Sequence, residues 1–362
     1  MLDRKPVTIH PDIAWFGDVR TVLSPMAGVT DRAFRDVCRA HGAGLAFCEF
    51  TAAKGLTYDN PQTWRLVDTE GEQGRVGVQI FGAEPDAMAG AARLMADKRL
   101  DVLDINFGCP AKKVVQKCGG SALLADVDLL KEIVDAVVAA SPVPVTAKIR
   151  TGWDDDSVNY REVGLLLQEA GCRWVTLHGR TRNQKFRGHA HWDCIADLVD
   201  VLDIPVIGNG DVVDGDTYAA MVRETRCHAV MVGRGAMGNP WLFRQMDAAD
   251  GLGACETPNL GEIMDVVEGH IAAVARLRGE RYGSQTVRKH VVRYFRDFPG
   301  AAAMRRRLFA TETGDAMLDV LAELRSEADL ESRPRCGTLQ LAENDDVNAS
   351  DLCCDLKEGD RS

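Results

Sequence analysis

The sequence has few aromatic residues and no long hydrophobic run. Aromatic side chains make up 6% of its 362 residues, and no stretch approaches the ~18 apolar residues that a membrane-spanning helix needs. Residues 1–15 mix charges and prolines without the apolar core of a secretory signal. We therefore expect a protein of the cytoplasm without a membrane partner. Its hydrophobic content of 46% and charged content of 27% are ordinary for a globular chain, and its length allows one large domain and a smaller one.

Disulfide and zinc patterns are also missing. Eleven cysteines are scattered over the chain, with no CxxC pair and no spacing typical of a zinc site. In a chain of this length they indicate neither a disulfide framework nor a metal centre. Cys109 is distinct because it follows a glycine in a loop-like stretch. Most others lie in apolar stretches, where a thiol packs as a small hydrophobic side chain; these include Cys38, Cys48, Cys172, Cys194 and Cys227.

Positive charge is scarce overall but concentrated in one segment. The net charge of −11 argues, for the whole chain, against a nucleic-acid partner. Residues 276–307, however, hold ten Arg or Lys and two acids, whereas residues 331–362 hold eight acids and four bases. The sequence thus predicts a local basic surface. It also predicts a last segment that is acidic, poor in large apolar residues and disordered.

Short apolar runs rich in β-branched residues alternate with stretches of helical periodicity from residue 21 to about residue 247. Such runs favour a parallel sheet covered on both faces. Eight strand–helix units in this length predict a (β/α)8 TIM barrel, with a doubly wound sheet as the alternative. The eight runs are residues 21–27, 44–50, 76–81, 102–107, 143–149, 173–178, 204–209 and 229–233.

After Pro258 the pattern becomes purely helical. Apolar residues recur with helical spacing over 263–278, 286–298, 301–310 and 315–324, and basic residues lie between them. We therefore divide the chain into three parts. They are a barrel domain over 1–250, a small all-helical domain over 258–328, and the acidic tail over 331–362.

A glycine-rich stretch follows the last predicted strand. Gly233-Arg-Gly-Ala-Met-Gly238 fits the pattern GxGxxG, but a dinucleotide-binding unit would continue into a further strand, and none follows. We interpret it as a phosphate-binding loop after barrel strand eight. The alternative is a plain glycine turn.

Polar residues lie at the ends of the predicted strands, where the active residues of TIM barrels are found. Amides suit the edges of a heterocycle, a lysine suits an anionic reduced flavin, and glycine-rich backbone with an arginine suits a phosphate. Together these needs predict FMN. His178 can instead be structural, and Glu49 can bind substrate or cap a loop. The predicted cofactor residues are Pro25, Met26, Ala27, Gln79, Lys148, His178, Asn209, Gly210, Asp211, Gly233 and Arg234.

Cys109 lies between Gly108 and Pro110, directly after the fourth predicted strand. The glycine permits an unusual turn and the proline ends regular structure, so we expect a loop that aims the thiol over the barrel mouth. A thiol with the usual pKa of about 8.5 is mostly protonated at neutral pH and can act as a general acid. The alternatives are a nucleophilic thiolate or an inert packing cysteine.

These stretches resemble the motifs of the tRNA-dihydrouridine synthases, from residue 21 to about residue 325. Phe107 and the pair Cys118-Gly119 depart from the usual pattern. The resemblance is strongest to the bacterial B-type branch, through CPAKK at 109–113 and GSAL at 120–123. The shared motifs are SPMAGVTD at 24–31, DINFGCP at 104–110, KIRTG at 148–152, HGRTR at 178–182, GNGD at 208–211, and GR at 233–234 with PW at 240–241.

The resemblance implies an activity and a partner. FMN, bound by the residues named above, would be reduced by NADPH and would then deliver hydride to C6 of a tRNA uridine, while Cys109 protonates C5. Asn106 and Arg180 are expected to contact the substrate. The helical domain is expected to bind tRNA phosphates, although a merely solvated helix face would look the same. The expected phosphate contacts are Arg288, Lys289, Arg293, Arg296, Arg305, Arg306 and Arg307.

Two other functions fit parts of this pattern. An FMN-dependent barrel that reduces a free pyrimidine or an enone would share the strand-end residues but would not need a basic helical domain. A non-catalytic RNA-binding regulator would keep the basic segment but would not need Cys109 or the flavin residues.

Overall fold

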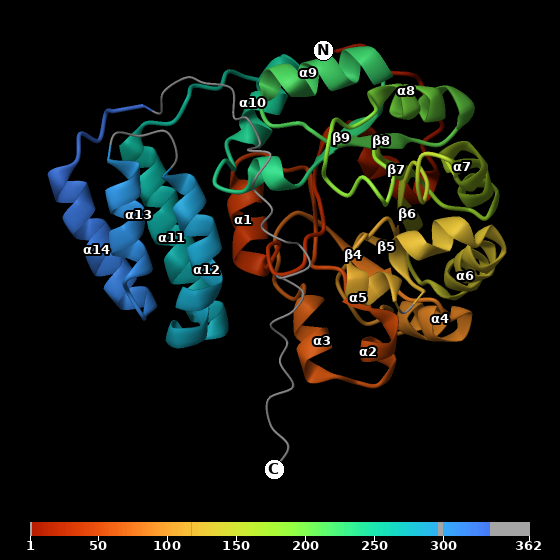
Figure 1. The fold of residues 1–362 in the computed structure, drawn as a ribbon, viewed down its shortest axis with the longest axis horizontal. Coiled ribbons are helices and arrows are strands. Elements are labelled where there is room, and N and C mark those ends of the chain that lie inside the picture. Colours follow the sequence, from red (N-terminus) through yellow and green to blue (C-terminus); the bar gives the residue numbers. More distant parts are fainter. Residues whose placement is uncertain (1, 117, 296–299, 334–362) are drawn as a thin grey trace.

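The computed structural model describes residues 2–116, 118–295 and 300–333. A closed parallel barrel with surrounding helices forms the larger part, and four further helices lie side by side next to it (Figure 1). Two sequence-based expectations, for Arg296 and for the acidic tail beyond residue 333, lie outside the described residues.

The strands close into a barrel, which confirms the predicted fold and excludes a doubly wound sheet. All pairings between the named strands are parallel, and the β1–β2, β1–β9 and β2–β4 pairs complete the ring. β3 continues the path of β2 and pairs further along β4, so nine strands make eight barrel positions. The strands are β1 (Thr21–Leu23), β2 (Leu45–Phe47), β3 (Thr51–Ala52), β4 (Arg75–Phe81), β5 (Val102–Phe107), β6 (Val145–Arg150), β7 (Val175–His178), β8 (Val206–Asn209) and β9 (Ala229–Val232).

Helices cover the outside of the barrel, as the alternating pattern predicts. Their buried apolar faces pack on outward strand residues such as Val78, Ile105 and Leu177 in one large hydrophobic cluster. The helices are α1 (Arg32–Ala40), α2 (Ala53–Thr57), α3 (Pro61–Leu66), α4 (Pro85–Arg93), α5 (Lys112–Val115), α6 (Val127–Ala140), α7 (Tyr160–Glu169), α8 (Trp192–Val201), α9 (Gly215–Thr225) and α10 (Leu242–Ala249), with 3-10 turns η1 (Pro11–Asp18), η2 (Gly120–Ala125) and η3 (Arg234–Ala236).

Inward strand residues form an apolar floor at the amino-terminal end of the barrel. Phe47 and Trp174 are fully buried there, and Phe47 fills the space beside Gly77, where any side chain would overlap its ring. The 3-10 turn η1 closes this end, because its Phe16 stacks on Trp174 with ring centroids 4.1 Å apart. Further along the strands, toward their carboxyl ends, the inward positions are polar. We call these residues the upper layer of the barrel interior; they are Gln79, Asp104, Asn106, Lys148, Arg150, His178 and Asn209.

The remaining helices share a hydrophobic cluster of their own. The first begins at Leu260, three residues before the predicted start, because Asn259 and Glu262 form a reciprocal capping box. The cluster also takes in Ala33 of α1 and Trp241, which joins it to the barrel. The domain boundaries drawn from the sequence stay predictions. The helices are α11 (Leu260–Arg278), α12 (Glu280–Tyr294), α13 (Ala301–Phe309) and α14 (Gly314–Glu327).

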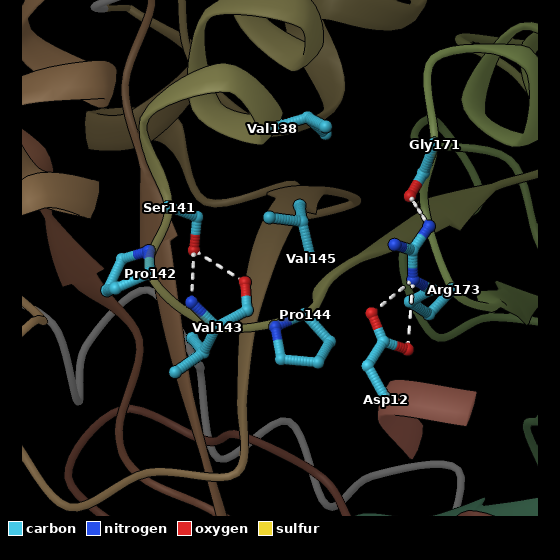
Figure 2. A pocket seen from close by; sticks show the side chains of 9 residues that line it. All are labelled: Asp12, Val138, Ser141, Pro142, Val143, Pro144, Val145, Gly171 and Arg173. Atoms are coloured by element: carbon cyan, nitrogen blue, oxygen red, sulfur yellow. Dashed lines mark hydrogen bonds and ion pairs between the residues drawn. The ribbon is translucent and has the colours of Figure 1, made fainter. Parts of the chain in front are cut away.

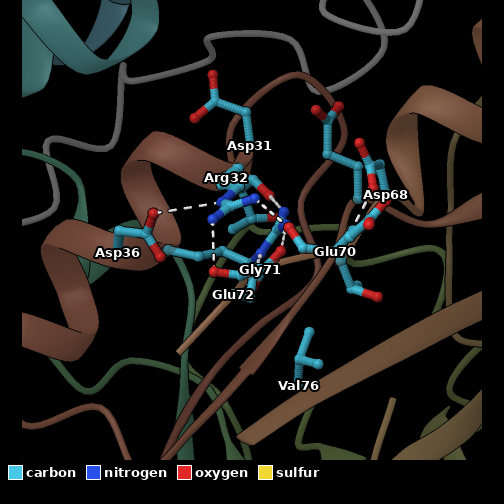
Figure 3. Close-up of polar contacts among 12 residues, drawn as sticks. Asp31, Arg32, Asp36, Asp68, Glu70, Gly71, Glu72 and Val76 are labelled. Carbon is cyan, nitrogen blue, oxygen red and sulfur yellow. Dashed lines mark hydrogen bonds and ion pairs between the residues drawn. The ribbon is translucent and has the colours of Figure 1, made fainter. Parts of the chain in front are cut away.

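A buried ion pair ties α1 to the loop before β4 (Figure 3). The side chains of Arg35 and Glu72 are 2% and 0% exposed; Arg35 also donates to the carbonyl of Thr30 at 2.7 Å. Arg39 adds a second contact to Glu72 at 2.7 Å. Burial opposes the charge on Glu72, but hydrogen bonds and charges from Arg35 and Arg39 outweigh it and lower the pKa of this carboxyl.

Glu72→Gln should lower the free energy of unfolding by about 3–5 kcal/mol at pH 7, because it leaves the Arg35 charge buried without its partner. Since the pKa of Glu72 is lowered in the folded state, its contribution is present above the unfolded value of about 4.3 and is lost as the pH falls below it. Urea unfolding between pH 3 and pH 7 measures both effects.

Asp36→Asn is the matched control. Asp36 pairs with Arg32 and Arg39, but its side chain is 46% exposed, so its loss should cost no more than about 1 kcal/mol. Equal losses for the two variants would show that the buried pair is not a special source of stability.

Candidate functional site

The expected cofactor residues come together at one end of the barrel. Gln79, Lys148, His178 and Asn209 lie on β4, β6, β7 and β8, at or near the carboxyl ends of the strands. The loop after β1 and the loop after β9 reach the same end, since β1 and β9 are paired neighbours. These loops and the one after β8 contribute Pro25, Met26, Ala27, Gly210, Asp211, Gly233 and Arg234.

A chain of amide hydrogen bonds positions the loop that contains Cys109. Gln79 donates to Asp104 at 2.7 Å and accepts from the amide of Asn106 at 2.8 Å. The side-chain oxygen of Asn106 in turn accepts from the backbone N–H groups of Gly108, at 3.0 Å, and Cys109, at 2.8 Å. Asn106, expected from the sequence to contact substrate, therefore also fixes the turn of this loop.

The other side of the Cys109 loop is held by η2. The hydroxyl and the backbone N–H of Ser121 both donate to the Cys109 carbonyl, at 2.9 and 3.2 Å. Gly120 has φ +60°, and a side chain there would press on the backbone of Cys109. Cys109 itself is half-buried, unlike the fully buried thiols of Cys38, Cys48, Cys172 and Cys227. Cys194, expected to be buried, is only half-buried, and Cys118 is exposed.

Lys148 and Asn209 cross the interior of the polar layer. The Lys148 ammonium donates to the Asn209 side chain at 2.7 Å, and Asn209 donates to the carbonyl of Met231 at 2.8 Å. Burial and the neighbouring charge of Arg150 lower the pKa of Lys148 to about 7, against the opposite effects of Asp104 and Cys109. An anion bound beside Lys148 would therefore favour its charged form.

His178 is kept neutral by the same surroundings. Burial lowers its pKa well below the usual value, and the charges of Arg150, Lys148, Arg180 and Arg234 act in the same direction. The upper layer is thus rich in cations, with the carboxyl groups of Asp104 and Asp211 as acids. A ligand with negative charge and a heteroaromatic ring would fit these donors and this charge.

Arg180 and Asp211 shape the edge of the layer. Arg180 donates to the Asp211 carboxylate at 2.8 Å and to the carbonyl of Gly188 at 2.6 Å, and it is 2% exposed. These bonds hold the loops at the edge of the layer together, and the expected contact of Arg180 with substrate stays a prediction. Gly210 has φ +127°, and a side chain there would lie 2.7 Å from Ala190. This backbone therefore allows a close approach that only glycine permits.

The GxGxxG stretch forms a turn against the helical domain. Gly238 has φ +77° and lies against the backbone of Arg293, where a side chain would overlap it. Arg234, at the start of η3, stacks over the ring of Phe186 with its guanidinium 4.6 Å from the ring centre. The stretch thus joins the barrel mouth to α12, and its predicted phosphate contact stays a prediction.

Several basic residues of the helical domain have partners inside that domain. Arg288 donates to the Thr311 carbonyl, and Arg305 donates to the Phe295 carbonyl at 2.7 Å. Arg307 forms ion pairs with Glu323 and Glu327 at 2.6 and 2.7 Å. Arg306 is exposed, whereas Lys289 and Arg293 are half-buried. A count of charges along the chain cannot separate these cases.

Glu49 connects the barrel to α11. Its carboxylate accepts from the N–H of Gly28 and from Arg278 at 3.2 Å. Arg278 also lies 3.8 Å from Asp31, the cap of α1. Burial raises the pKa of Glu49, against the effects of Gly28 and Arg278. Of the two roles left open for Glu49, the contacts favour the loop-holding one.

Asp104 and Arg150 were not assigned roles from the sequence. Asp104 is two residues before Asn106, and Arg150 is two residues after Lys148, so the two-residue period of a strand puts each on the same inward face as a predicted site residue. This two-residue spacing is the sequence signal that could have identified Asp104 and Arg150 as site residues. Burial raises the pKa of Asp104 to about 6, against hydrogen bonds from Gln79 and Thr146.

The opposite end of the barrel has a shallow surface pocket of about 260 Å³ where β6 begins (Figure 2). Arg173 lies at its edge and binds Asp12 at 2.8 Å and the Gly171 carbonyl at 2.8 Å. Catalytic residues of TIM barrels are not found at this end.

In the described part of the chain, no three His, Cys, Asp or Glu side chains are grouped as a metal site needs. No described helix is both long and apolar enough to cross a bilayer.

Asp104→Asn tests the charge state of the upper layer. Because the folded pKa of Asp104 is raised to about 6, its contribution to stability is present below the unfolded value of about 3.9 and is lost as the pH rises through 6. The free energy of unfolding of the unmodified protein, minus that of the variant, should therefore fall by roughly 2–3 kcal/mol between pH 4 and pH 7. Urea titrations at each pH measure this difference.

The exposed Asp135, which pairs with Lys131 on α6, provides the control variant Asp135→Asn. Its difference from the unmodified protein should stay within about 0.5 kcal/mol over this range. A constant difference for Asp104→Asn as well would contradict the raised pKa.

Comparison with known proteins identifies the family. Residues 22–329 match the family described as dihydrouridine synthase (Dus). The tRNA-dihydrouridine synthase B of Vibrio cholerae is 39% identical over 302 residues, which are 83% of this chain and 94% of the relative. That of Xanthomonas campestris is 40% identical over 314 residues, or 86% and 92% of the two chains. That of Pasteurella multocida is 41% identical over 283 residues, or 76% and 83%. The chain therefore belongs to the dihydrouridine synthase family and is an oxidoreductase of that family.

Proposed function

We propose that this protein reduces the C5–C6 double bond of uridines in tRNA to 5,6-dihydrouridine, with FMN as its cofactor and NADPH as the reductant. Family membership supports a tRNA substrate, because the similar relatives are named tRNA-dihydrouridine synthases. The flavin follows from what the resemblance of the sequence motifs to this family implies. The observation that carries the proposal is the position of Cys109, held by Asn106 at the mouth of a barrel whose upper layer is rich in cations.

The upper layer has the groups that FMN needs. Gln79 and Asn209 would hold the ring through their amide groups, and Lys148 would supply a cation. His178, Asp211 and the backbone of Gly210 would border the ribityl and phosphate groups, together with Gly233 and Arg234. The turn formed by Pro25, Met26 and Ala27 would cover the ring. When bound, FMN supplies the hydride that adds to C6 of the uracil.

Cys109 supplies the proton. Addition of hydride at C6 builds negative charge toward C5 and O4, and a thiol beside C5 neutralises it by general acid catalysis. Asn106 and Ser121 fix the backbone of Cys109 from two sides, so the thiol is oriented before substrate binds. Solvent then restores the thiol proton.

The helical domain supplies the tRNA surface in this proposal. Among the described side chains of the basic segment, Arg276 on α11 and Arg306 on α13 are exposed and so accessible to phosphates. The residues with internal partners, Arg288, Arg305 and Arg307, would maintain the shape of this surface. The cytoplasm, where tRNA is modified and thiols stay reduced, fits the eight described cysteines, none of which forms a disulfide.

Cys109→Ala should keep bound FMN and its reduction by NADPH but lose dihydrouridine formation by at least about 100-fold, the usual contribution of a general acid. Dihydrouridine in unmodified tRNA, measured by mass spectrometry of nucleosides, gives the yield. The control is Cys118→Ala, which removes an exposed thiol from the same loop and should leave the yield unchanged. A normal yield from Cys109→Ala would reject the proton-donor role, and a preference for free uridine over tRNA would reject the substrate.

Arg306→Glu should weaken tRNA binding several-fold near 150 mM salt. The slope of log Kd against log salt concentration should fall by about 1, the amount expected for the loss of one phosphate contact. Oxidation of NADPH by the flavin should be unchanged, because Arg306 lies on α13, outside the barrel. Lys131→Glu, on the exposed face of α6, is the control and should bind normally. An unaltered binding curve for Arg306→Glu would mean that tRNA uses another surface.

A further inference from the structure

Arg150, the last residue of β6, connects two loops at the barrel mouth. Its Nε donates to the carbonyl of Gly108, directly before Cys109, at 2.8 Å. Its Nη1 donates to the carbonyls of Thr181 and Lys185, in the loop after β7, at 2.9 and 2.8 Å. The residue is 2% exposed. Arg150 therefore bridges the loop that contains Cys109 and the loop after β7.

The acceptors of Arg150 are neutral, which is unusual for a buried guanidinium. Each of its three hydrogen bonds ends on a main-chain carbonyl, and Phe186 covers it, with the guanidinium 5.5 Å from the ring centre. Burial, together with the charges of Arg180 and Arg234, lowers the pKa of Arg150 to about 9. The group that acts in the opposite direction is Cys109, when its thiol is ionised. A buried cation of this kind is stabilised when an anion forms beside it.

The charged and titratable groups around Cys109 and Arg150 come from several elements. Lys148 shares β6 with Arg150, and it too is affected by Cys109. His178 and Arg180 face Arg150 from the end of β7, and Arg234 faces it from the loop after β9. Asp211 is paired with Arg180, and Asp104 acts on Lys148. Of these groups, only Arg150 binds the backbone next to the thiol.

We propose that Arg150 is a positioning residue for the proton transfer: it holds the Cys109 loop through the Gly108 carbonyl and stabilises the thiolate that remains after Cys109 gives up its proton. In this step the S–H bond breaks, its electron pair stays on sulfur, and the proton forms the new C–H bond at C5 of the reduced base. The hydride at C6 comes from the reaction proposed above. The inference thus rests on the proposed function.

The pH dependence of alkylation tests this role in the FMN-loaded protein without tRNA. Iodoacetamide reacts with the thiolate, and peptide mass spectrometry reports Cys109 and Cys118 separately. In the unmodified protein the reaction of Cys109 should have its midpoint at least about one pH unit below that of the exposed Cys118. Arg150→Gln should raise the Cys109 midpoint by about one pH unit and leave that of Cys118 in place.

Two further variants separate charge from packing. Arg150→Lys keeps the cation and should restore most of the Cys109 midpoint, which a purely structural role for Arg150 would not predict. Arg187→Gln removes a positive charge from an exposed position of the loop after β7 and should not move it. An unchanged Cys109 midpoint in folded Arg150→Gln would overturn the proposal. If that variant does not fold, a Cys109 midpoint equal to or above that of Cys118 in the unmodified protein would overturn it.

The alkylation result is independent of the reaction itself. A shifted midpoint together with no dihydrouridine formation by the unmodified protein would reject the proposed function but retain the coupling of Arg150 to the thiol. Normal dihydrouridine formation with an unshifted midpoint would retain the proposed function but reject the coupling of Arg150 to the thiol.

Discussion

The alternation of inward and outward side chains along the barrel strands is the constraint on which the rest of the structure depends. On β5, Leu103 and Ile105 face the helices, so Asp104 and Asn106 must face the interior. The same period gives Thr146, Lys148 and Arg150 on β6. Because the ring is closed, side chains that are distant in sequence meet inside it, as Lys148 of β6 meets Asn209 of β8. The site is thus a layer of the barrel interior.

The chemistry of this layer follows from a charge imbalance that the fold itself does not relieve. Lys148 is half-buried and Arg150 is buried, both with neutral hydrogen-bond acceptors, and His178 is neutral because it is buried and cations surround it. Natural interiors rarely keep buried charges without partners. An imbalance of this kind, at the end of a barrel where ligands bind, is typical of a site completed by an anionic ligand. The floor below the layer is formed by apolar side chains such as Phe47 and Trp174 and serves for packing.

The sequence was sufficient to predict the barrel, because each strand has apolar residues that face outward and polar residues at its end. It was also sufficient for the grouping of Gln79, Lys148, His178 and Asn209, since the carboxyl ends of parallel strands must meet. It was not sufficient for contacts that depend on which loops become neighbours. The bond from Arg150 to Gly108 joins residues 42 positions apart, and that from Arg278 to Glu49 joins residues 229 positions apart. No local pattern indicates either.

The helical domain shows the limit of charge counting. Ten basic residues in a short segment predict a positive surface, but Arg305 and Arg288 bind carbonyls within the domain and Arg307 pairs with two glutamates. Propensity and periodicity describe a helix on its own, whereas these contacts arise between helices. The start of α11 was missed for a simpler reason: its cap at Asn259 lies before the first apolar residue of the repeat.

The floor of the barrel has a consequence for how the chain reaches its folded state. Phe16 and Ile13 are made early on the ribosome, yet the ring against which Phe16 stacks belongs to Trp174. The partner of Arg4 is also made late, because Arg4 binds Asp250 at 2.6 Å. At synthesis rates of roughly 5–20 residues per second, the first segment stays exposed for many seconds before its partners leave the ribosome. The apolar side chains of this first segment therefore stay exposed to water, without their native partners, until Trp174 has been made.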